Sequence, residues 1–379
     1  MEEFKERGHQ VYILASSLET GAGGYAIEGG LHVIRAKVPK HQNVGNIKKG
    51  ISNLLLPFAY RRALKKHLPK DIQFDLIITP TPPITLAGLA ARLKRKYKAK
   101  YYLILRDIFP QNAVDLGFIS KSGLLYRFFR AMEKRMYANA DHIGCMSQGN
   151  IDYVKKHNPG IEQDKLHLLR NWQKPSPAVN KTKQELKEQF GLKGQFVLFF
   201  GGNIGKPQRI ENLIALAKYY KNDNQISLLI VGRGTEFARL KNTIDDEELG
   251  NMQLLDALPR DEYFQVMQMA DIGLISLDER FTIPNLPSKV LSYFNAKLPV
   301  VAIIDENTDF GSWVQDDIKA GFWNTIDNFN TIVEKIEFLR SNKEFSAQLG
   351  QNGYDYFCEQ LLVENAYQTI MSRIDDEVV

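Results

Sequence analysis

The sequence lacks any apolar run of the roughly 20 residues that a membrane-spanning helix needs. Its longest candidate, Ile51 to Tyr60, is interrupted by Asn53 and Pro57. Cysteine is also scarce. The two that occur, Cys145 and Cys358, are far apart and have no ligand-like neighbours, which argues against a disulfide framework or a zinc site. The first residues mix acidic and basic side chains, unlike a secretory signal. We therefore expect a cytoplasmic protein.

Several chemical signatures are missing too. No Asp-x-Asp pair occurs, so a divalent metal has no obvious carboxylate clamp, and we expect neither a metal nor a cofactor. We find no Ser-His-Asp arrangement, and the seven histidines are scattered. The aromatic-rich strand motifs of RNA-binding domains are absent as well, so we expect no nucleic-acid partner.

What is present is a globular composition, 44% hydrophobic and 25% charged, over 379 residues, a length that suits two domains. The net charge of +5 conceals a division. Residues 1–180 hold 29 Lys and Arg against 14 Asp and Glu, and the remainder holds 20 against 30. An excess of positive charge in one half predicts a polyanionic partner. On charge alone the candidates are nucleic acid, an anionic membrane surface or a phosphate-bearing substrate. A merely solvated basic surface is the plain alternative.

Short apolar runs alternate with helix-like segments along the whole chain, a rhythm typical of α/β architecture with parallel sheets. We expect helices at Leu86 to Lys98 and at Leu124 to Tyr137. The expected strands are Val11–Ala15, Val33–Ala36, Leu76–Thr79, Tyr101–Leu105, Ile143–Met146, Leu166–Leu169, Phe196–Phe200, Ser227–Val231, Met252–Leu255, Ile272–Ile275 and Val300–Ile304.

The segment from Trp172 to Pro177 contains two prolines and lies near the point where the charge imbalance changes sign, which indicates a linker. We therefore predict two Rossmann-like domains, residues 1–172 and 178–350. Residues 351–379 are expected to form a C-terminal helix that packs back toward the first domain.

Three segments of the second half suggest an anion site. After the strand Phe196–Phe200, a glycine-containing turn leads into a helix, where backbone N–H groups and the helix dipole favour a phosphate. A second strand ends in a glycine turn, and Pro287 precedes a helix start at which a serine is a plausible N-cap. Neither the dinucleotide fingerprint nor the P-loop is matched. The candidate residues are Gly202, Asn203, Gly205, Lys206, Gln208, Arg209, Gly232, Arg233, Ser288 and Lys289. Simple turn glycines and a solvated lysine are the plain alternatives.

The three segments just described, in the order in which they occur along the chain, resemble family 4 of the glycosyltransferases. The members of that family are retaining sugar-nucleotide enzymes of the two-Rossmann GT-B fold. Arg7–Val11, Ala140–Ile143 and Leu168–Trp172 are similar to other parts of that family. Arg106–Val114 resembles the R-D-[LI]-[WF]-P segment of a bacterial subset that assembles capsule, O-antigen and related polysaccharides and includes N-acetylfucosamine transferases. The resemblance implies transfer of a sugar, such as an N-acetylated deoxyhexosamine, from a UDP-sugar to a polyprenyl-diphosphate-linked saccharide.

The sequence departs from the family at the donor site. The Arg that usually follows the strand glycine and the Lys five positions later are replaced by Asn203 and Gln208, with Lys206 and Arg209 adjacent. The two Glu of the family's E-x7-E pattern fall on Pro284 and Ser292, the second in the position that holds the nucleotide ribose. Glu279 lies upstream and could serve if its loop folds back.

The chemistry implied by the resemblance needs preorganised donors for the departing nucleoside diphosphate. Lys206, Arg209 and Lys289, with two helix N-termini, can provide them without a metal. Asp107, at the end of a first-domain strand, is the candidate to face the acceptor hydroxyl. The alternative for Asp107 is a loop-capping carboxylate paired with Arg106.

Basic residues surround the apolar stretch Ile51 to Tyr60, a composition that suits the headgroup boundary of an anionic leaflet. They are Arg35, Lys37, Lys40, Lys48, Lys49, Arg61, Arg62, Lys65, Lys66 and Lys70. The resemblance to the family implies peripheral docking on the inner face of the cell membrane, because the lipid-linked acceptor is embedded there. An ordinary core helix with solvated lysines is the alternative.

Two further functions stay open from the sequence. One is a sugar-nucleotide epimerase of the same fold, although the carboxylates and histidines it needs are not evident. The other is a non-catalytic protein that binds anionic membranes through a decayed site.

The family begins with a strand, a glycine loop and a helix before its Arg-Gly-His turn, yet here Arg7 follows only six residues. The first strand is central in a doubly wound sheet, and its absence leaves unpaired edges. The glycines from Gly21 to Gly24 lie after Val11–Ala15, on the wrong side to replace that loop. We therefore expect the first domain to lack its first strand. Either the natural product starts about 20–30 residues upstream, or this chain has a deficient acceptor domain.

Overall fold

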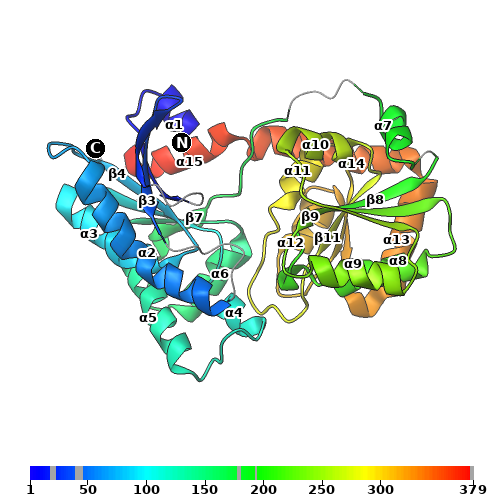
Figure 1. Ribbon diagram of the computed structural model, residues 1–379, viewed down its shortest axis with the longest axis horizontal. Coiled ribbons are helices and arrows are strands. Elements are labelled where there is room, and N and C mark those ends of the chain that lie inside the picture. Colours follow the sequence, from blue (N-terminus) through cyan, green and yellow to red (C-terminus); the bar gives the residue numbers. More distant parts are fainter. Residues whose placement is uncertain (18–22, 39–45, 177–180, 193, 376–379) are drawn as a thin grey trace. The chain divides into compact units, whose positions relative to one another are not determined.

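The computed structural model describes residues 1–17, 23–38, 46–176, 181–192 and 194–375 (Figure 1). It separates into two compact units. Unit 1 comprises Met1–Arg170 and Ala366–Val379, and unit 2 comprises Asn171–Asn365. Segment 351–379 is not one helix, because its described part holds the end of α14 (Lys343–Gln360) and all of α15 (Val363–Asp375), separated at Leu361 and Leu362.

Unit 2 is built on one parallel sheet with the strand order β10-β9-β8-β11-β12-β13. Its strands are β8 (Phe196–Asn203), β9 (Ile226–Arg233), β10 (Met252–Leu255), β11 (Ile272–Ser276), β12 (Val300–Ile303) and β13 (Gly321–Asn324). These strands are almost continuously apolar because both faces of the sheet are covered. Val197 and Phe199 contribute to one core, whereas Leu198 and Phe200 contribute to the other.

Helices cover the two faces of this sheet (Figure 1). On the face with Phe199 lie α7 (Lys183–Gln189), α10 (Arg260–Gln268), α11 (Lys289–Asn295), α12 (Phe310–Ser312) and α14 (Lys343–Gln360). On the face with Phe200 lie α8 (Ile210–Tyr219), α9 (Phe237–Asp246) and α13 (Phe329–Ser341). Two 3-10 turns, η3 (Lys206–Gln208) and η5 (Ile326–Asn328), and a short π-helix, η4 (Trp313–Asp317), complete the unit.

Unit 1 contains two separate sheets. The first has the order β1-β3-β2, from β1 (Tyr12–Ser17), β2 (Gly24–Glu28) and β3 (Leu31–Lys37), with β2 antiparallel to β3. The second is parallel and contains β4 (Leu76–Pro80), β5 (Lys100–Leu105), β6 (His142–Cys145) and β7 (Leu166–Leu168). The helices of unit 1 are α1 (Glu2–Glu6), α2 (Asn46–His67), α3 (Ala87–Tyr97), α4 (Gln111–Asp115), α5 (Leu124–Asn139), α6 (Gln148–His157) and α15 (Val363–Asp375). The unit also contains two 3-10 turns, η1 (Ile84–Leu86) and η2 (Gln163–Lys165).

The expected strands are all present, with small shifts at their ends, and two Rossmann-like α/β units with parallel sheets are confirmed. Sequence reasoning missed β2 and β13. Both are short and begin with glycine, and β2 has polar neighbours, so neither has the long apolar run of a central strand.

The sheet of unit 1 is interrupted between β1 and β4. Within the described residues, β1 pairs only with β3 and β4 pairs only with β5. The described part of the chain contains no helix with the length and apolarity to cross a bilayer.

Candidate functional site

The strand order of unit 2 reverses between β8 and β11, because β9 and β10 lie on one side of β8 and β12 and β13 lie beyond β11. In parallel α/β sheets a crevice opens at this point beside the carboxyl ends of the strands, and ligands bind there. The chain segments that follow β8 and β11 are therefore the first place to look for a site.

Glycines allow β8 and β9 to approach closely at that end. Gly202 has a φ of +107°, a conformation that other residues rarely adopt. Gly232 is paired with it, and a Cβ on Gly232 would lie 1.8 Å from the carbonyl oxygen of Gly202. Gly232 therefore belongs to strand β9 rather than to a turn, and close packing explains why it has no side chain.

The connection from β8 to α8 is a tight 3-10 turn, η3. Asn203 Nδ2 donates to Gln208 Oε1 at 2.8 Å across it, so these two predicted residues contact each other. Lys206 is exposed on the turn, and Gly205 is buried. The turn ends at Arg209, whose φ of +38° lies in the left-handed region. The backbone of Arg209 is therefore strained and needs support.

Two buried polar side chains provide that support. Asn212 Nδ2 donates to Ser276 Oγ at 3.1 Å, and Ser276 Oγ donates to the Arg209 carbonyl oxygen, also at 3.1 Å. Sequence reasoning did not select Asn212 or Ser276. The sequence offers only a weak signal for them: Ser276 is a polar residue at the end of an apolar strand, and Asn212 is a polar residue on the apolar face of a helix.

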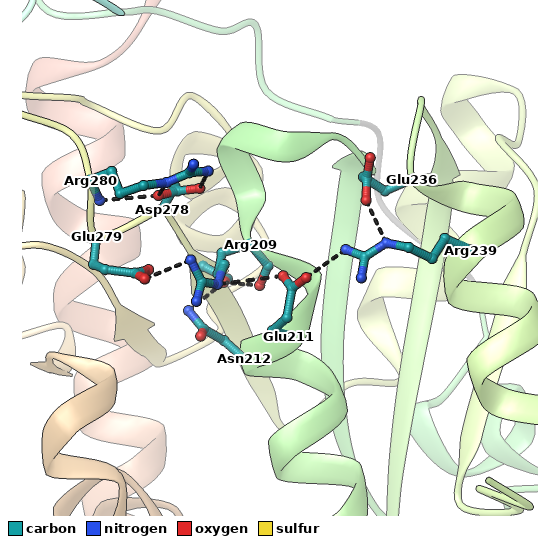
Figure 2. Close-up of polar contacts among 9 residues, drawn as sticks. Arg209, Glu211, Asn212, Glu236, Arg239, Asp278, Glu279 and Arg280 are labelled. Atoms are coloured by element: carbon teal, nitrogen blue, oxygen red, sulfur yellow. Dashed lines mark hydrogen bonds and ion pairs between the residues drawn. The ribbon is translucent and has the colours of Figure 1, made fainter. Parts of the chain in front are cut away.

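The side chain of Arg209 lies between two carboxylates. Its Nη1 contacts Glu279 Oε1 at 2.6 Å, and its Nε lies 3.5 Å from Glu211 Oε2 (Figure 2). Glu211 also binds Arg239 at 2.6 Å. The loop after β11 thus does fold back to bring Glu279 to the glycine turn. Asp278 anchors it, since its backbone N–H donates to the Pro207 carbonyl oxygen at 3.0 Å.

Lys289 opens α11, but it is not a solvated lysine. Its Nζ is buried 3.4 Å from the ring centroid of Phe200, two residues before Gly202, and has no hydrogen-bond partner among the described residues. Burial lowers the pKa of this amine well below its usual value. Ser288 occupies the N-cap position of α11, as expected, but the capping hydrogen bond is missing. Ser288 adopts helical angles, from which its side chain makes no capping hydrogen bond.

Two other residues predicted to bind the donor, Arg233 and Ser292, contact partners outside the glycine turn. Arg233 is exposed and paired with Asp256, with Nη2 donating at 3.0 Å. Ser292 Oγ donates to Gln173 Oε1 at 3.0 Å, so its hydroxyl already has a partner.

Asp305, two residues after the end of β12, is a residue that sequence reasoning missed. Burial raises the pKa of its carboxyl to about 6, although hydrogen bonds from backbone amides, including that of Asn307 at 2.8 Å, oppose the shift. Its Oδ2 is buried without a partner among the described residues. The sequence signal that could have identified Asp305 is a carboxylate that follows an apolar strand.

Asp107 lies in unit 1, shortly after β5. Its backbone N–H and carbonyl both bond to the Thr81 hydroxyl, at 3.2 and 3.1 Å. Burial raises the pKa of its carboxyl, and the neighbouring Arg106 guanidinium partly opposes this. No group of three or more His, Cys, Asp or Glu side chains in the described ranges is arranged to hold a metal ion.

Two family models match the chain side by side. Residues 1–172 match the glycosyl transferase 4-like domain, and residues 182–356 match the glycosyl transferases group 1 domain. Two curated proteins are similar. A probable glycosyltransferase of Pseudomonas aeruginosa, WbjE, is 23% identical over 76% of this chain and 70% of its own length. A putative colanic acid biosynthesis glycosyl transferase of Escherichia coli, WcaI, is 24% identical over 62% of this chain and 59% of its own length.

A solved structure shares the fold. HepE from Anabaena, in complex with UDP and glucose, superposes with a TM-score of 0.69 at 15% identity, over 97% of this chain and 100% of that one. The fold is therefore that of the GT-B glycosyltransferases.

Proposed function

Because this chain belongs to the glycosyltransferases that combine a 4-like domain with a group 1 domain, we propose that it moves a sugar from a UDP-sugar to a polyprenyl-diphosphate-linked saccharide. The reaction retains the configuration of the sugar and needs no metal. The sugar is an N-acetylated deoxyhexosamine, and the product enters capsule, O-antigen or a similar polysaccharide. The name of WcaI, which refers to colanic acid, supports this context.

The observation that carries the proposal is the pair of basic side chains near the carboxyl end of β8. Lys289 Nζ is buried without a hydrogen-bond acceptor beside Phe200, and Arg209 lies at the start of α8. A departing nucleoside diphosphate gains negative charge, and preorganised cations and amides stabilise that charge most where water is excluded. Lys289, once protonated, and Arg209 supply the charge, and the turn from Gly202 to Gln208 supplies the backbone amides.

Arg209 must change partners for this role. In the structure its guanidinium is held by Glu279 and Glu211. A diphosphate that displaces Glu279 leaves that carboxylate free to accept a hydrogen bond from the donor's ribose or sugar hydroxyls. The donor base is assigned as uracil because HepE, which shares the fold, was solved with UDP.

On the acceptor side, Asp107 is the proposed contact for the attacking hydroxyl. Burial raises the pKa of this carboxyl and so strengthens it as a hydrogen-bond acceptor and proton acceptor.

The lipid carrier of the acceptor places the protein on the inner face of the cell membrane. On α2, the apolar side chains Leu54, Leu55 and Phe58 are exposed, Phe58 by 70%, and the exposed Arg61 and Arg62 follow one turn later. Exposed apolar side chains beside cations suit an anionic headgroup layer. Lys40 lies outside the described residues, as do the side chains of Lys48 and Lys49.

A second exposed apolar group supports the same docking. Leu124, Leu125 and Phe128, at the start of α5, are exposed by 82%, 51% and 48%. Both α5 and α2 contact η1, so the two helices that carry these exposed groups share a neighbour in unit 1.

Calorimetry with UDP, ADP and GDP on the folded protein tests the donor site. We expect UDP to bind and the two purine nucleotides to bind more weakly. A folded protein that binds none of them would contradict the proposal. A donor screen with a synthetic lipid-diphosphate saccharide then identifies the sugar, and transfer that requires added Mg²⁺ would contradict the metal-independent mechanism.

A further inference from the structure

The segment that follows β12 carries a carboxylate with one unused oxygen. Asp305 is 2% exposed, and its Oδ1 accepts a hydrogen bond from the Asn307 backbone N–H at 2.8 Å. Its Oδ2 is buried and has no hydrogen-bond partner among the described residues. A buried carboxylate oxygen without a donor costs free energy, so a ligand group that donates a hydrogen bond here would stabilise the site.

A buried amide with an unused nitrogen lies on an adjoining segment. Asn285 Nδ2 has no hydrogen-bond partner in the part of the chain that the structure describes. The Thr308 hydroxyl donates to the Asn285 carbonyl oxygen at 2.7 Å. Asn307 Nδ2 donates to the Phe281 carbonyl oxygen, also at 2.7 Å. These bonds fasten the segment after β12 to the loop that leads to α11. The unused acceptor of Asp305 and the unused donor of Asn285 thus lie on two segments in contact, yet they do not bond to each other.

Asp305 lies at the same edge of the sheet as the turn η3. Ser276 of β11 is paired with Ile303 of β12. Asp278 and Asp305 each follow two residues after this pair. The Asp278 backbone N–H donates to the Pro207 carbonyl oxygen in η3 at 3.0 Å. Neighbouring strands are about 4.8 Å apart, so the ends of β8 and β12, on either side of β11, are about 10 Å apart. A sugar attached to a diphosphate can span that separation.

We propose that Asp305 and Asn285 bind the sugar of the nucleotide-sugar donor. Asp305 Oδ2 accepts a hydrogen bond from an O–H or N–H group of the sugar, and Asn285 Nδ2 donates to one of its oxygen atoms. The inference rests on the proposed function and adds the two side chains that select the transferred sugar. A sugar without the matching group leaves a buried carboxylate or amide unpaired, and sites of that kind reject such analogues strongly.

The loop that covers Asp305 is released where the donor diphosphate binds. Glu279 lies near the start of this loop, between β11 and α11, and its Oε1 contacts Arg209 Nη1 at 2.6 Å. A diphosphate that takes over Arg209 frees Glu279, whereas the far end of the loop stays bonded to Thr308. The sugar attached to that diphosphate then reaches Asp305 from the side of η3.

Calorimetry on the full chain separates sugar binding from nucleotide binding. The ligands are UDP, UDP-glucose, UDP-galactose and UDP-N-acetylglucosamine, and the variants are Asp305→Asn and Asn285→Ala. Asp305→Asn keeps the size of the side chain but presents an N–H group where the sugar needs an acceptor. We expect each variant to weaken binding of the UDP-sugar with the highest affinity about 10- to 100-fold, and to change UDP affinity by less than about twofold.

Glu306→Gln is the matched control, because Glu306 is an exposed carboxylate next in sequence to Asp305. It should leave the affinities for UDP and for the UDP-sugars unchanged. An effect of Asp305→Asn with UDP-N-acetylglucosamine alone would identify the acetamido N–H as the group that Asp305 accepts, and an equal effect with UDP-glucose would identify a hydroxyl. Near-UV circular dichroism checks the fold of each variant. Asn285→Ala gives an independent result if Asp305→Asn does not fold.

Three results would overturn the proposal. Unchanged UDP-sugar affinities in both variants would mean that water, rather than sugar, meets the two side chains. An equal loss of UDP and UDP-sugar binding would mean that the two side chains only hold the loop in place. A wild-type chain that binds UDP but none of the UDP-sugars would show that no sugar reaches Asp305. Failure of the wild-type chain to bind UDP would instead contradict the proposed function itself.

Discussion

At the scale of single residues, unit 2 contains two buried ionisable groups that lack a full set of partners among the described residues. Lys289 Nζ has no hydrogen-bond acceptor, and Asp305 Oδ2 has no donor, among the described residues. Unpaired buried polar atoms lower the free energy of unfolding, so their presence needs another explanation. A ligand that supplies the missing partners is the explanation that fits a transferase.

Lys289→Ala should therefore weaken UDP binding by about 1–3 kcal/mol, the scale of a lost charged hydrogen bond. The same substitution should leave the free energy of unfolding unchanged or raise it, since a buried unpaired amine is removed. Calorimetry and urea denaturation measure the two effects, with the exposed Lys241→Ala as control. Unchanged UDP affinity in Lys289→Ala would remove this residue from the donor site.

Asp305 predicts a pH dependence of stability. Its carboxyl has a folded-state pKa of about 6 against a usual 3.8, so the folded protein binds the proton more tightly than the unfolded chain does. Stability from this group is present below about pH 4 and is lost as the pH rises through 6. With allowance for partial solvent exposure, Asp305→Asn should raise the free energy of unfolding by about 1–2 kcal/mol at pH 8 and by almost nothing at pH 4.

Urea denaturation at the two pH values checks this expectation, and Asp245→Asn, on an exposed carboxylate, is the control. An equal effect of Asp305→Asn at pH 4 and pH 8 would show that the carboxyl does not titrate between them.

At the scale of elements, the site depends on how closely β8 and β9 approach before the chain turns into α8. The strands meet at Gly202 and Gly232, and the turn that follows is held by Ser276 and Asn212 through the Arg209 carbonyl. The turn is thus held both by its neighbours and by the hydrogen bond from Asn203 to Gln208 within it.

Gly232→Ala should lower the free energy of unfolding by about 2–4 kcal/mol, because the new methyl group would meet a backbone carbonyl at 1.8 Å that no rotamer change can relieve. Gly250→Ala is the matched control, since a Cβ there has no neighbour within 4 Å. Chemical denaturation compares the two variants, and equal stabilities would mean that β9 shifts freely away from β8.

At the scale of the whole molecule, positive charge is concentrated in the first half of the chain and negative charge in the second. The exposed apolar side chains of α2 and α5 lie in the positive half. This coincidence is the basis for the proposal that unit 1 docks on an anionic membrane surface.

The protein should sediment with vesicles that contain anionic lipid, and the bound fraction should fall as salt is added. Phe58→Asp should reduce binding about tenfold, the effect of losing one inserted aromatic side chain. Tyr219→Asp, on a 56% exposed aromatic of unit 2, should leave it unchanged. Equal binding to neutral vesicles would indicate purely apolar contact, and no binding would rule out the docking surface.

Much of the fold follows from the sequence because buried parallel strands need continuous apolar runs, and the chain shows them at β5, β8, β9 and β12. Edge strands such as β2 and β13 need less apolar sequence, and so the pattern did not reveal them.

For the site, the sequence by itself determined which segments carry glycines and cations after β8 and at the start of α11. Only the tertiary structure decided what those groups contact. The pairing of Arg209 with Glu279 joins residues from two loops, and the burial of Lys289 beside Phe200 joins a helix to a strand. Local sequence fixes local conformation, whereas the pKa of Lys289 and the partners of Arg209 depend on neighbours that only the folded chain brings together.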